Sequence, residues 1–176
     1  MKTMRAILSM TLFGAALIST ASLTWAHGDE HLDPNMKVDN PITAQETPYG
    51  RQGFPRDAVR TIDITLNDPA RYAPDLLTVK AGDTVRLRLI NTGQQPHEFV
   101  LGTEESLAQH AAMMMQMPDM RHADPNTVRI DAGKTGELVW QFTHPGSFFY
   151  ACLMPGHRQA GMQGRVVVLP ADPSTH

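Results

Sequence analysis

Residues 150–164 read YACLMPGHRQAGMQG and gather three metal-binding side chains in one short segment. Cys152, the only cysteine of the chain, stands five residues before His157 and ten before Met162. Prolines and glycines interrupt the segment, which predicts a loop rather than a strand or a helix. A thiolate and a thioether suit Cu(I), while imidazole suits both oxidation states of copper. Together, the three residue types indicate an electron-transfer copper site.

A site of this kind needs a second histidine, because its ligands are one cysteine, two histidines and a weak axial methionine. His97 is the natural candidate, since it follows a predicted turn at residues 91–95 and begins a predicted short strand. It lies more than fifty residues before Cys152, but the start of a strand can meet a loop at one end of a β-sandwich. Zinc is the main competitor, although structural zinc prefers several thiolates and methionine is a poor zinc ligand.

Most of the chain beyond Arg60 predicts short strands joined by turns. Apolar and polar residues alternate in several segments, which is the period of a strand with one buried face. These segments are RTIDITLND (60–68), LLTVKAGDTVRLRLINTG (76–93) and ELVWQF (137–142), with a closing strand in RVVVLP (165–170). Strands at this spacing, separated by glycine and proline turns, predict an all-β fold of the β-sandwich type.

One helix is predicted over residues 103–117, TEESLAQHAAMMMQM. Thr103 can cap its first turn, two glutamates follow at the positive end of the helix dipole, and Pro118 ends it. Four potential copper ligands fall at i, i+3, i+4 and i+7 and so share one face of this helix: His110, Met113, Met114 and Met117. They form either a second site, for Cu(I), or a core-facing stripe in which methionine fills gaps.

The first 26 residues have the pattern of a secretory signal peptide, with basic residues, an apolar run and then small residues. The apolar run is too short to span a bilayer. We therefore predict export to the periplasm, with no membrane insertion after cleavage. Residues 27–59 predict a flexible N-terminal arm, 60–170 the folded domain and 171–176 a polar tail.

The charge balance argues against a nucleic-acid partner. The whole chain has a formal net charge of −3, and loss of the signal peptide removes two basic residues and no acidic one, which brings the charge to about −5. A lone cysteine in an exported protein cannot form an internal disulfide. The thiol is then buried, paired with another chain or bound to a metal, and metal ligation is favoured because His157 and Met162 lie nearby in sequence.

Three segments together resemble a cupredoxin, a type 1 copper protein, over residues 61–169. They are VKAGDTVRLRLIN, NTGQQPHEFVLG and FFYACLMPGHRQAGMQG. The resemblance implies a Greek-key β-sandwich with one inserted helix, in which His97, Cys152 and His157 would be equatorial ligands and Met162 the axial ligand. Within the family, the chain looks most similar to exported bacterial cupredoxins linked to copper tolerance. Its N-terminal arm and methionine-rich helix depart from the family pattern.

The predicted function is that of a periplasmic copper-binding cupredoxin with one type 1 copper, which acts in copper tolerance or homeostasis and can transfer single electrons. Additional Cu(I) would bind to the histidine and methionines on the predicted helix. The alternative is a dedicated electron carrier between redox partners, with no role in copper tolerance. We expect a monomer whose partner is a redox protein or a copper-handling protein. An enzymatic role is not expected, because copper oxidases and reductases need further ligands, usually in His-x-His pairs, and the sequence has none.

Overall fold

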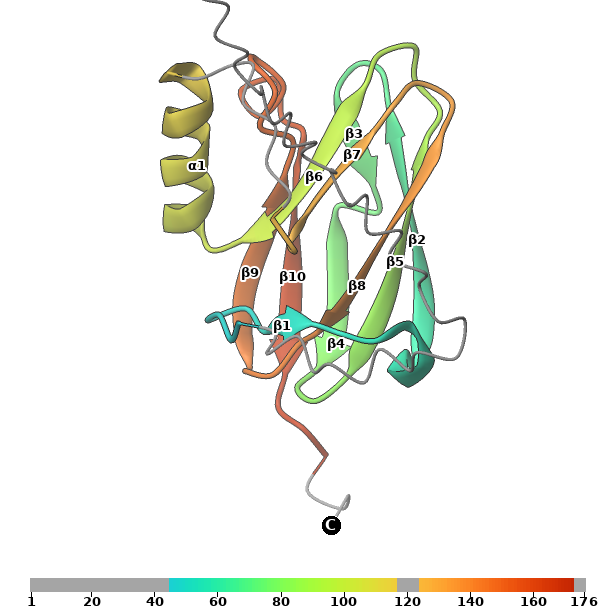
Figure 1. Ribbon diagram of the computed structural model, residues 1–176, viewed down its shortest axis with the longest axis vertical. Coiled ribbons are helices and arrows are strands. Elements are labelled where there is room, and N and C mark those ends of the chain that lie inside the picture. The colour runs from blue at the N-terminus through green and yellow to red at the C-terminus, as the bar shows by residue number, and fades with distance from the viewer. Residues whose placement is uncertain (1–44, 117–123, 173–176) are drawn as a thin grey trace, which may run out of the picture. The chain divides into compact units, whose positions relative to one another are not determined.

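The computed structural model of the protein describes residues 45–116 and 124–172, which form a sandwich of two five-stranded sheets (Figure 1). The first sheet has the strand order β1-β8-β5-β2-β3 and the second the order β4-β10-β9-β6-β7. In the first sheet the strands are β1 (Arg51–Gln52), β2 (Arg60–Asn67), β3 (Arg71–Ala73), β5 (Thr84–Asn91) and β8 (Thr135–Gln141). In the second they are β4 (Leu76–Lys80), β6 (His97–Gly102), β7 (Thr127–Ile130), β9 (Gly146–Ala151) and β10 (Gln163–Leu169). The predicted all-β sandwich is confirmed.

The core lies between the sheets, and the alternation seen in the sequence builds it. In β5, Val85, Leu87 and Leu89 are fully buried, while Arg88 is exposed on the opposite face. Leu87 is paired with Ile62 of β2 on one side and with Leu138 of β8 on the other. A one-residue shift in either pairing would expose these apolar side chains, so burial fixes the register of the sheet.

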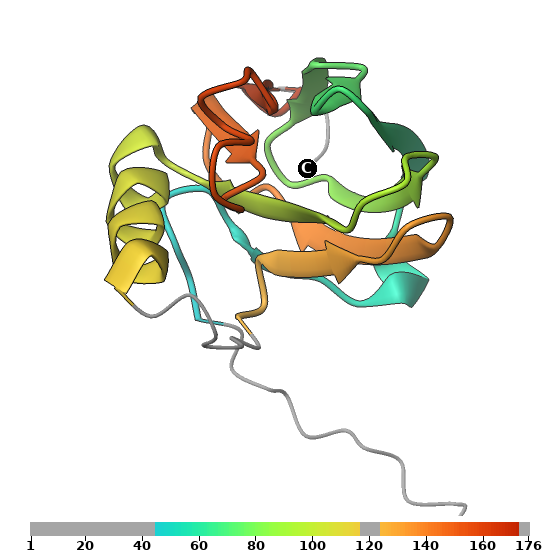
Figure 2. The ribbon, with the colours of Figure 1, turned by 90° about the horizontal axis from the view of Figure 1, so that it is seen from above.

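Strand β6 is buried along its whole length because both of its faces are covered. Phe99 and Leu101 point into the sandwich core, whereas Val100 packs with Leu107 of helix α1 (Glu104–Gln116) in a smaller apolar cluster. Figure 2 shows α1 lying outside the sandwich, next to the sheet that contains β6. The helix on its outer face therefore explains why residues 99–101 of this strand are apolar without a polar break.

The helix bounds agree with the prediction within one residue, and its N-terminus is capped as expected. The Thr103 side-chain oxygen accepts a hydrogen bond from the Ser106 backbone N–H at 3.1 Å. The Ser106 hydroxyl in turn accepts one from the Thr103 backbone N–H at 2.9 Å. This reciprocal pair satisfies two backbone donors at the helix start, with serine in the place that glutamate usually takes.

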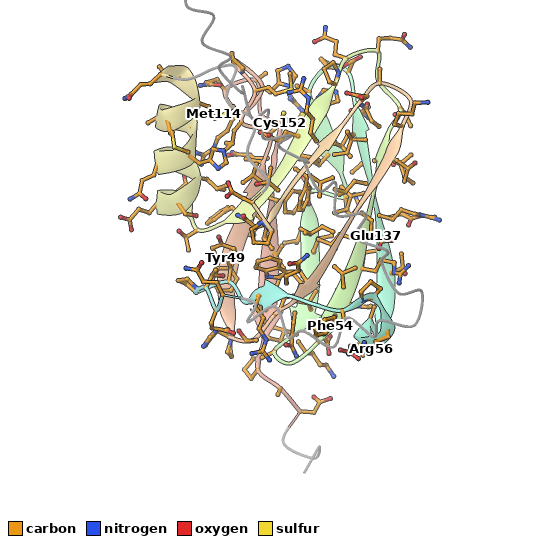
Figure 3. The ribbon with its side chains drawn as sticks, viewed as in Figure 1. Tyr49, Phe54, Arg56, Met114, Glu137 and Cys152 are labelled. Atoms are coloured by element: carbon orange, nitrogen blue, oxygen red, sulfur yellow. The ribbon has the colours of Figure 1, made fainter. Side chains whose placement is uncertain are left out.

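The described part of the predicted arm, residues 45–59, contributes a strand to the first sheet. Strand β1 pairs with β8, and a short 3₁₀ helix (Pro55–Asp57) follows it. Tyr49 stacks on the buried Trp140 with ring centroids 5.6 Å apart, and its carbonyl accepts the Trp140 indole N–H at 2.7 Å. Figure 3 shows Phe54 near the end of the sandwich opposite Cys152, and Tyr49 between the two.

Residues 1–44 and 173–176 lie outside the described residues, and with them the predicted signal peptide, the rest of the predicted arm and most of the predicted tail. Strand β3 was not predicted, because its three residues are too few to show a periodic pattern. Among the described helices, none has the length and apolar character required to cross a membrane.

Candidate metal centre

His97 is the first residue of β6 and is fully buried, although histidine is a polar side chain. Its backbone is paired with Ile130 of β7. The turn before it is held by Asn91, whose side-chain amide donates hydrogen bonds to the carbonyls of Gln95 (2.8 Å) and Ile130 (3.0 Å). A buried asparagine thus places the preceding turn against the strand, which fixes the backbone that carries the imidazole.

Cys152 follows the last residue of β9 and is buried at the end of the core nearest to His97. The Glu98 backbone N–H donates to its Sγ at 3.4 Å. Burial raises the pKa of the Cys152 thiol to about 11, and the backbone N–H groups of Glu98 and Met154 oppose this shift. The metal-free thiol is therefore protonated at neutral pH, and a metal ion that binds it must displace this proton.

The loop from Cys152 to Met162 is closed by its own backbone hydrogen bonds. The Cys152 N–H donates to the Met162 carbonyl at 3.1 Å, and the Met162 N–H donates to the His157 carbonyl at 2.9 Å. These two hydrogen bonds hold the backbones of Cys152, His157 and Met162, the three predicted ligands of the loop, close together. Gly161, with a φ of +101°, makes the return turn in a conformation that side chains disfavour. Arg71 donates to the adjacent Ala160 carbonyl and ties the loop to β3.

Strand β9 is anchored just before the loop by Tyr150, which is fully buried. Its ring packs over Gly164 of β10, where a Cβ atom would lie 2.2 Å from the ring. Its hydroxyl donates to the Pro74 carbonyl at 2.8 Å. The tyrosine and the glycine are thus a matched pair that holds Cys152 at the edge of the core.

The structure brings His97, Cys152 and His157 together as one cluster of metal-binding atoms. The two Nδ1 atoms of His97 and His157 are 3.3 Å apart, and His157 Nδ1 is also 3.3 Å from Cys152 Sγ. All three donor atoms lie within 4.8 Å of one another. Metal–nitrogen and metal–thiolate bonds are about 2.0 and 2.3 Å long, so a single ion could bridge donors at these separations.

The donor set fits copper in chemistry as well as in spacing. One thiolate and two imidazoles match the equatorial ligands of an electron-transfer copper site, whose axial ligand is a weakly held methionine. Met162 is fully buried, and its backbone forms hydrogen bonds with the backbones of both Cys152 and His157. Its place in the loop is therefore suited to the axial role.

His157 differs from His97 because it reaches the surface. It is half-buried and lines a shallow hollow of about 480 Å³ together with Asp68, Gln95 and His97. Partial burial lowers the pKa of its imidazole, the nearby His97 lowers it further, and Asp68 acts in the opposite direction. The ring is therefore neutral at pH 7, which is the protonation state that a metal ligand needs.

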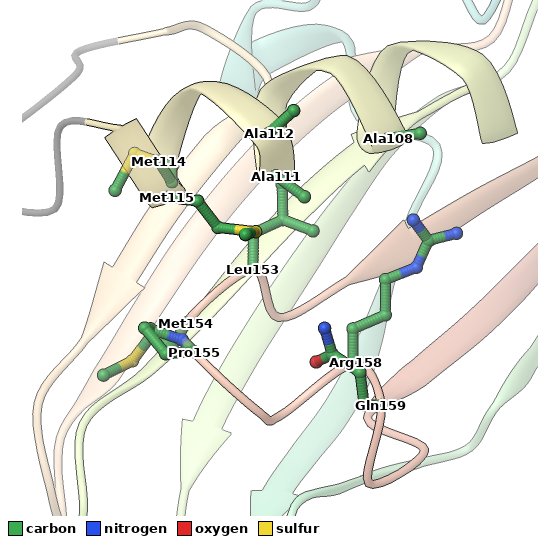
Figure 4. Close-up of a pocket in the computed structure, with 10 residues that line it drawn as sticks. All are labelled: Ala108, Ala111, Ala112, Met114, Met115, Leu153, Met154, Pro155, Arg158 and Gln159. Atoms are coloured by element: carbon green, nitrogen blue, oxygen red, sulfur yellow. The ribbon is translucent and has the colours of Figure 1, made fainter.

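The structure places three of the four predicted helix ligands, and the fourth, Met117, lies outside the described residues. His110, Met113 and Met114 are all half-buried on α1. Met114 also lines an apolar groove of about 310 Å³ between α1 and the ligand loop, with Met115 of the helix and Met154 of the loop (Figure 4). His110 and Met113 do not line that groove. The methionines that line it with Met114 are Met115 and Met154, and neither was among the predicted helix ligands.

Comparison with known proteins agrees with a copper site at this cluster. Residues 59–169 match the copper-binding proteins of the plastocyanin/azurin family. The chain belongs to this family. As a cupredoxin it takes copper as its cofactor, one ion per chain, and the cluster of His97, Cys152 and His157 is suited to hold it.

Relatives of this cupredoxin include proteins named for copper resistance. Over 123 residues it is 54% identical to the copper-resistant cuproprotein CopI of Rubrivivax gelatinosus, covering 70% of this chain and 74% of that protein. It is 34% identical to CopI of Pseudomonas aeruginosa over 162 residues, covering 73% and 89% of the two chains. Among solved structures, auracyanin B, a protein also known from Chloroflexus aurantiacus, superposes with a TM-score of 0.59 at 24% identity, over 69% of this chain and 96% of that one. The last likeness shows the shared fold.

Sequence reasoning missed two contacts of the cluster. One is the Glu98 backbone N–H on Cys152 Sγ, and the other is the Asp68 carboxylate, whose Oδ1 lies 3.3 Å from His97 Nε2. Asp68 is far from His97 in the chain and stands in no recognisable motif. The packing of the two sheets brings the end of β2 next to the start of β6 and so places Asp68 at the site.

Proposed function

We propose that this cupredoxin works in the periplasm in copper tolerance, and that it can also transfer single electrons. The proposed type 1 ligands are His97, Cys152, His157 and Met162. The observation that carries the proposal is the convergence of one thiol and two imidazole nitrogens from distant segments within 4.8 Å. The relatives named for copper resistance support tolerance as the biological role.

The residues around the cluster would do three kinds of work. Bound copper supplies a one-electron couple between Cu(II) and Cu(I). His97 lies on β6 and Cys152 directly follows β9, which are neighbouring strands of the second sheet. The sheet would hold both ligands rigidly, so the ligand positions would change little when the charge at the site changes. The Glu98 N–H donates to the sulfur and stabilises its negative charge, which tunes the couple. His157, at the surface hollow, is the edge through which an electron would enter or leave.

The role in tolerance is tested by growth of the source organism. Deletion of the gene should lower the copper concentration that stops growth, because the protein would no longer sequester the metal outside the cytoplasm. The native gene should restore tolerance, and a Cys152→Ser copy, exported to the same level in the periplasmic fraction, should not. If the deletion strain tolerates copper normally but loses electron flow to an oxidoreductase, the dedicated electron carrier is the correct function.

We further propose that the methionines of α1 hold a second, labile Cu(I). Met113 and Met114 are consecutive residues of α1, one turn after His110, and thioethers prefer Cu(I). Both residues are half-buried and so are more open to solvent than residues of the packed core. Such a site would load and release copper faster than the buried cluster.

Titration of the metal-free Cys152→Ser variant with Cu(I), against a chromophoric chelator, tests this second site. We expect residual binding of about one Cu(I) per chain, which is lost when Met113, Met114 and Met117 are changed to Leu. Met154→Leu is the matched control, because Met154 belongs to the groove but not to the predicted helical face. Absence of residual binding would refute the second site, and loss of binding in the control would move it to the groove.

A further inference from the structure

The imidazole of His97 is held at both of its nitrogen atoms. Nδ1 faces the metal cluster, 3.3 Å from Nδ1 of His157. Nε2, on the other side of the ring, lies 3.3 Å from Oδ1 of Asp68. When Nδ1 is used as a ligand, Nε2 carries the proton and donates a hydrogen bond to the carboxylate. The contact thus joins a carboxylate to a ligand histidine at the nitrogen that the metal leaves free.

Asp68 is itself held in a defined position by the turn that precedes β6. The Gln94 backbone N–H donates to its Oδ2 at 2.7 Å. Gly93 makes room for the carboxylate, because a Cβ atom at this position would lie 2.9 Å from Oδ2. The Gly93 N–H in turn donates to the Asn91 side-chain oxygen at 2.9 Å. Each carboxylate oxygen therefore has its own donor, and the turn is shaped around the group.

The two partners differ in their exposure to solvent. The His97 side chain is 1% exposed, whereas that of Asp68 is 39% exposed. The carboxylate therefore contacts both water and the buried ring. A negative charge at this distance from the metal cluster favours the more positive of two metal oxidation states.

We propose that Asp68 is a positioning residue of the copper centre, which fixes the orientation and tautomer of His97 and favours Cu(II) over Cu(I). This inference rests on the proposed ligand set. Its hydrogen bond makes Nδ1 a stronger donor to the metal, and its charge adds to the effect. Both act in the same direction and lower the reduction potential of the site.

The test is Asp68→Asn, studied as the copper-loaded full-length mature protein. The amide is nearly isosteric but uncharged, and it offers one acceptor oxygen where the two donors need two. We expect the affinity for Cu(II) to fall by about 10-fold to 100-fold, with a smaller loss for Cu(I). A tenfold change in the ratio of the two affinities raises the potential by about 59 mV for a one-electron couple.

Two further variants separate this role from a general effect of charge or folding. Gly93→Ala keeps every charge but pushes the Asp68 carboxylate out of its place, so it should raise the potential in the same direction. Asp57→Asn removes an equal charge from the exposed 3₁₀ helix, which lies at the end of the sandwich away from Cys152 (Figure 3), and should change the potential far less.

The outcomes distinguish this inference from the ligand assignment. If native protein and Asp68→Asn share a thiolate-to-copper band and an equal potential, Asp68 has no such role and the ligand set stands. If Asp57→Asn raises the potential as much as Asp68→Asn does, net charge alone is responsible and the positioning role is wrong. If the native protein shows no thiolate-to-copper band, the proposed ligand set itself fails.

Discussion

Cys152→Ser is expected to weaken Cu(II) binding by more than about 100-fold, since loss of an outer-shell partner alone costs 10-fold to 100-fold. The serine hydroxyl stays protonated at neutral pH and cannot replace a thiolate. Cys152 also links two parts of the site, because its Sγ lies 3.3 Å from His157 Nδ1 and accepts from the Glu98 N–H. Competition of the metal-free proteins against a chelator of known affinity measures the loss.

His144→Ser is the matched control for this experiment. His144 is an exposed turn histidine, with 55% of its side chain accessible, and it does not belong to the cluster of metal-binding atoms. The control should keep the Cu(II) affinity of the native protein. A Cys152→Ser protein that binds Cu(II) as tightly as the control would show that the copper is held elsewhere.

Trp140→Ala should lower the free energy of unfolding of the metal-free protein by about 3–5 kcal/mol, the usual cost of emptying a buried aromatic site. Trp140 is 1% exposed and lies on β8 of the first sheet, where it is paired with Val85 of β5 and Gln52 of β1. Its ring stacks on Tyr49, so the substitution also loosens residues 45–53 from the sheet. Urea denaturation, followed by circular dichroism, measures the change.

Trp140→Phe separates the volume of the ring from its hydrogen bond. It keeps most of the apolar contact but leaves the Tyr49 carbonyl without its indole donor, so a smaller loss of about 1–3 kcal/mol is expected. If Trp140→Ala costs less than the phenylalanine variant, Trp140 and the packing of Tyr49 are not central to the stability of this domain.

The sequence predicted the parts of the fold that repeat along the chain. Alternation over β2, β5 and β8 gave the strands, because one face of each strand is buried and the other is wet. The helix was predicted from Thr103 and its capping context. Residues 45–59 were assigned to the arm because they are polar and aperiodic, and their order comes from contacts with Trp140 and β8 that no local pattern reveals.

The candidate site was predictable in its ligands but not in its surroundings. A cysteine, a histidine and a methionine at fixed spacing in one loop can be recognised from the sequence alone. His97 was predicted because a copper site of this kind needs a second histidine, which the loop does not supply. Asp68 and the Glu98 N–H carry no such signal, because an aspartate after a strand and a backbone amide are common features. Their importance arises from the packing of β6 against the loop and the 91–95 turn.

The absorption and electron paramagnetic resonance spectra of the copper-loaded native protein test the central claim most directly. With Cys152, His97 and His157 as equatorial ligands, the Cu(II) form should show an intense thiolate-to-copper band in the visible region, which disappears in Cys152→Ser. A colourless Cu(II) protein without this band, whose copper loading is unchanged by Cys152→Ser, would contradict the account.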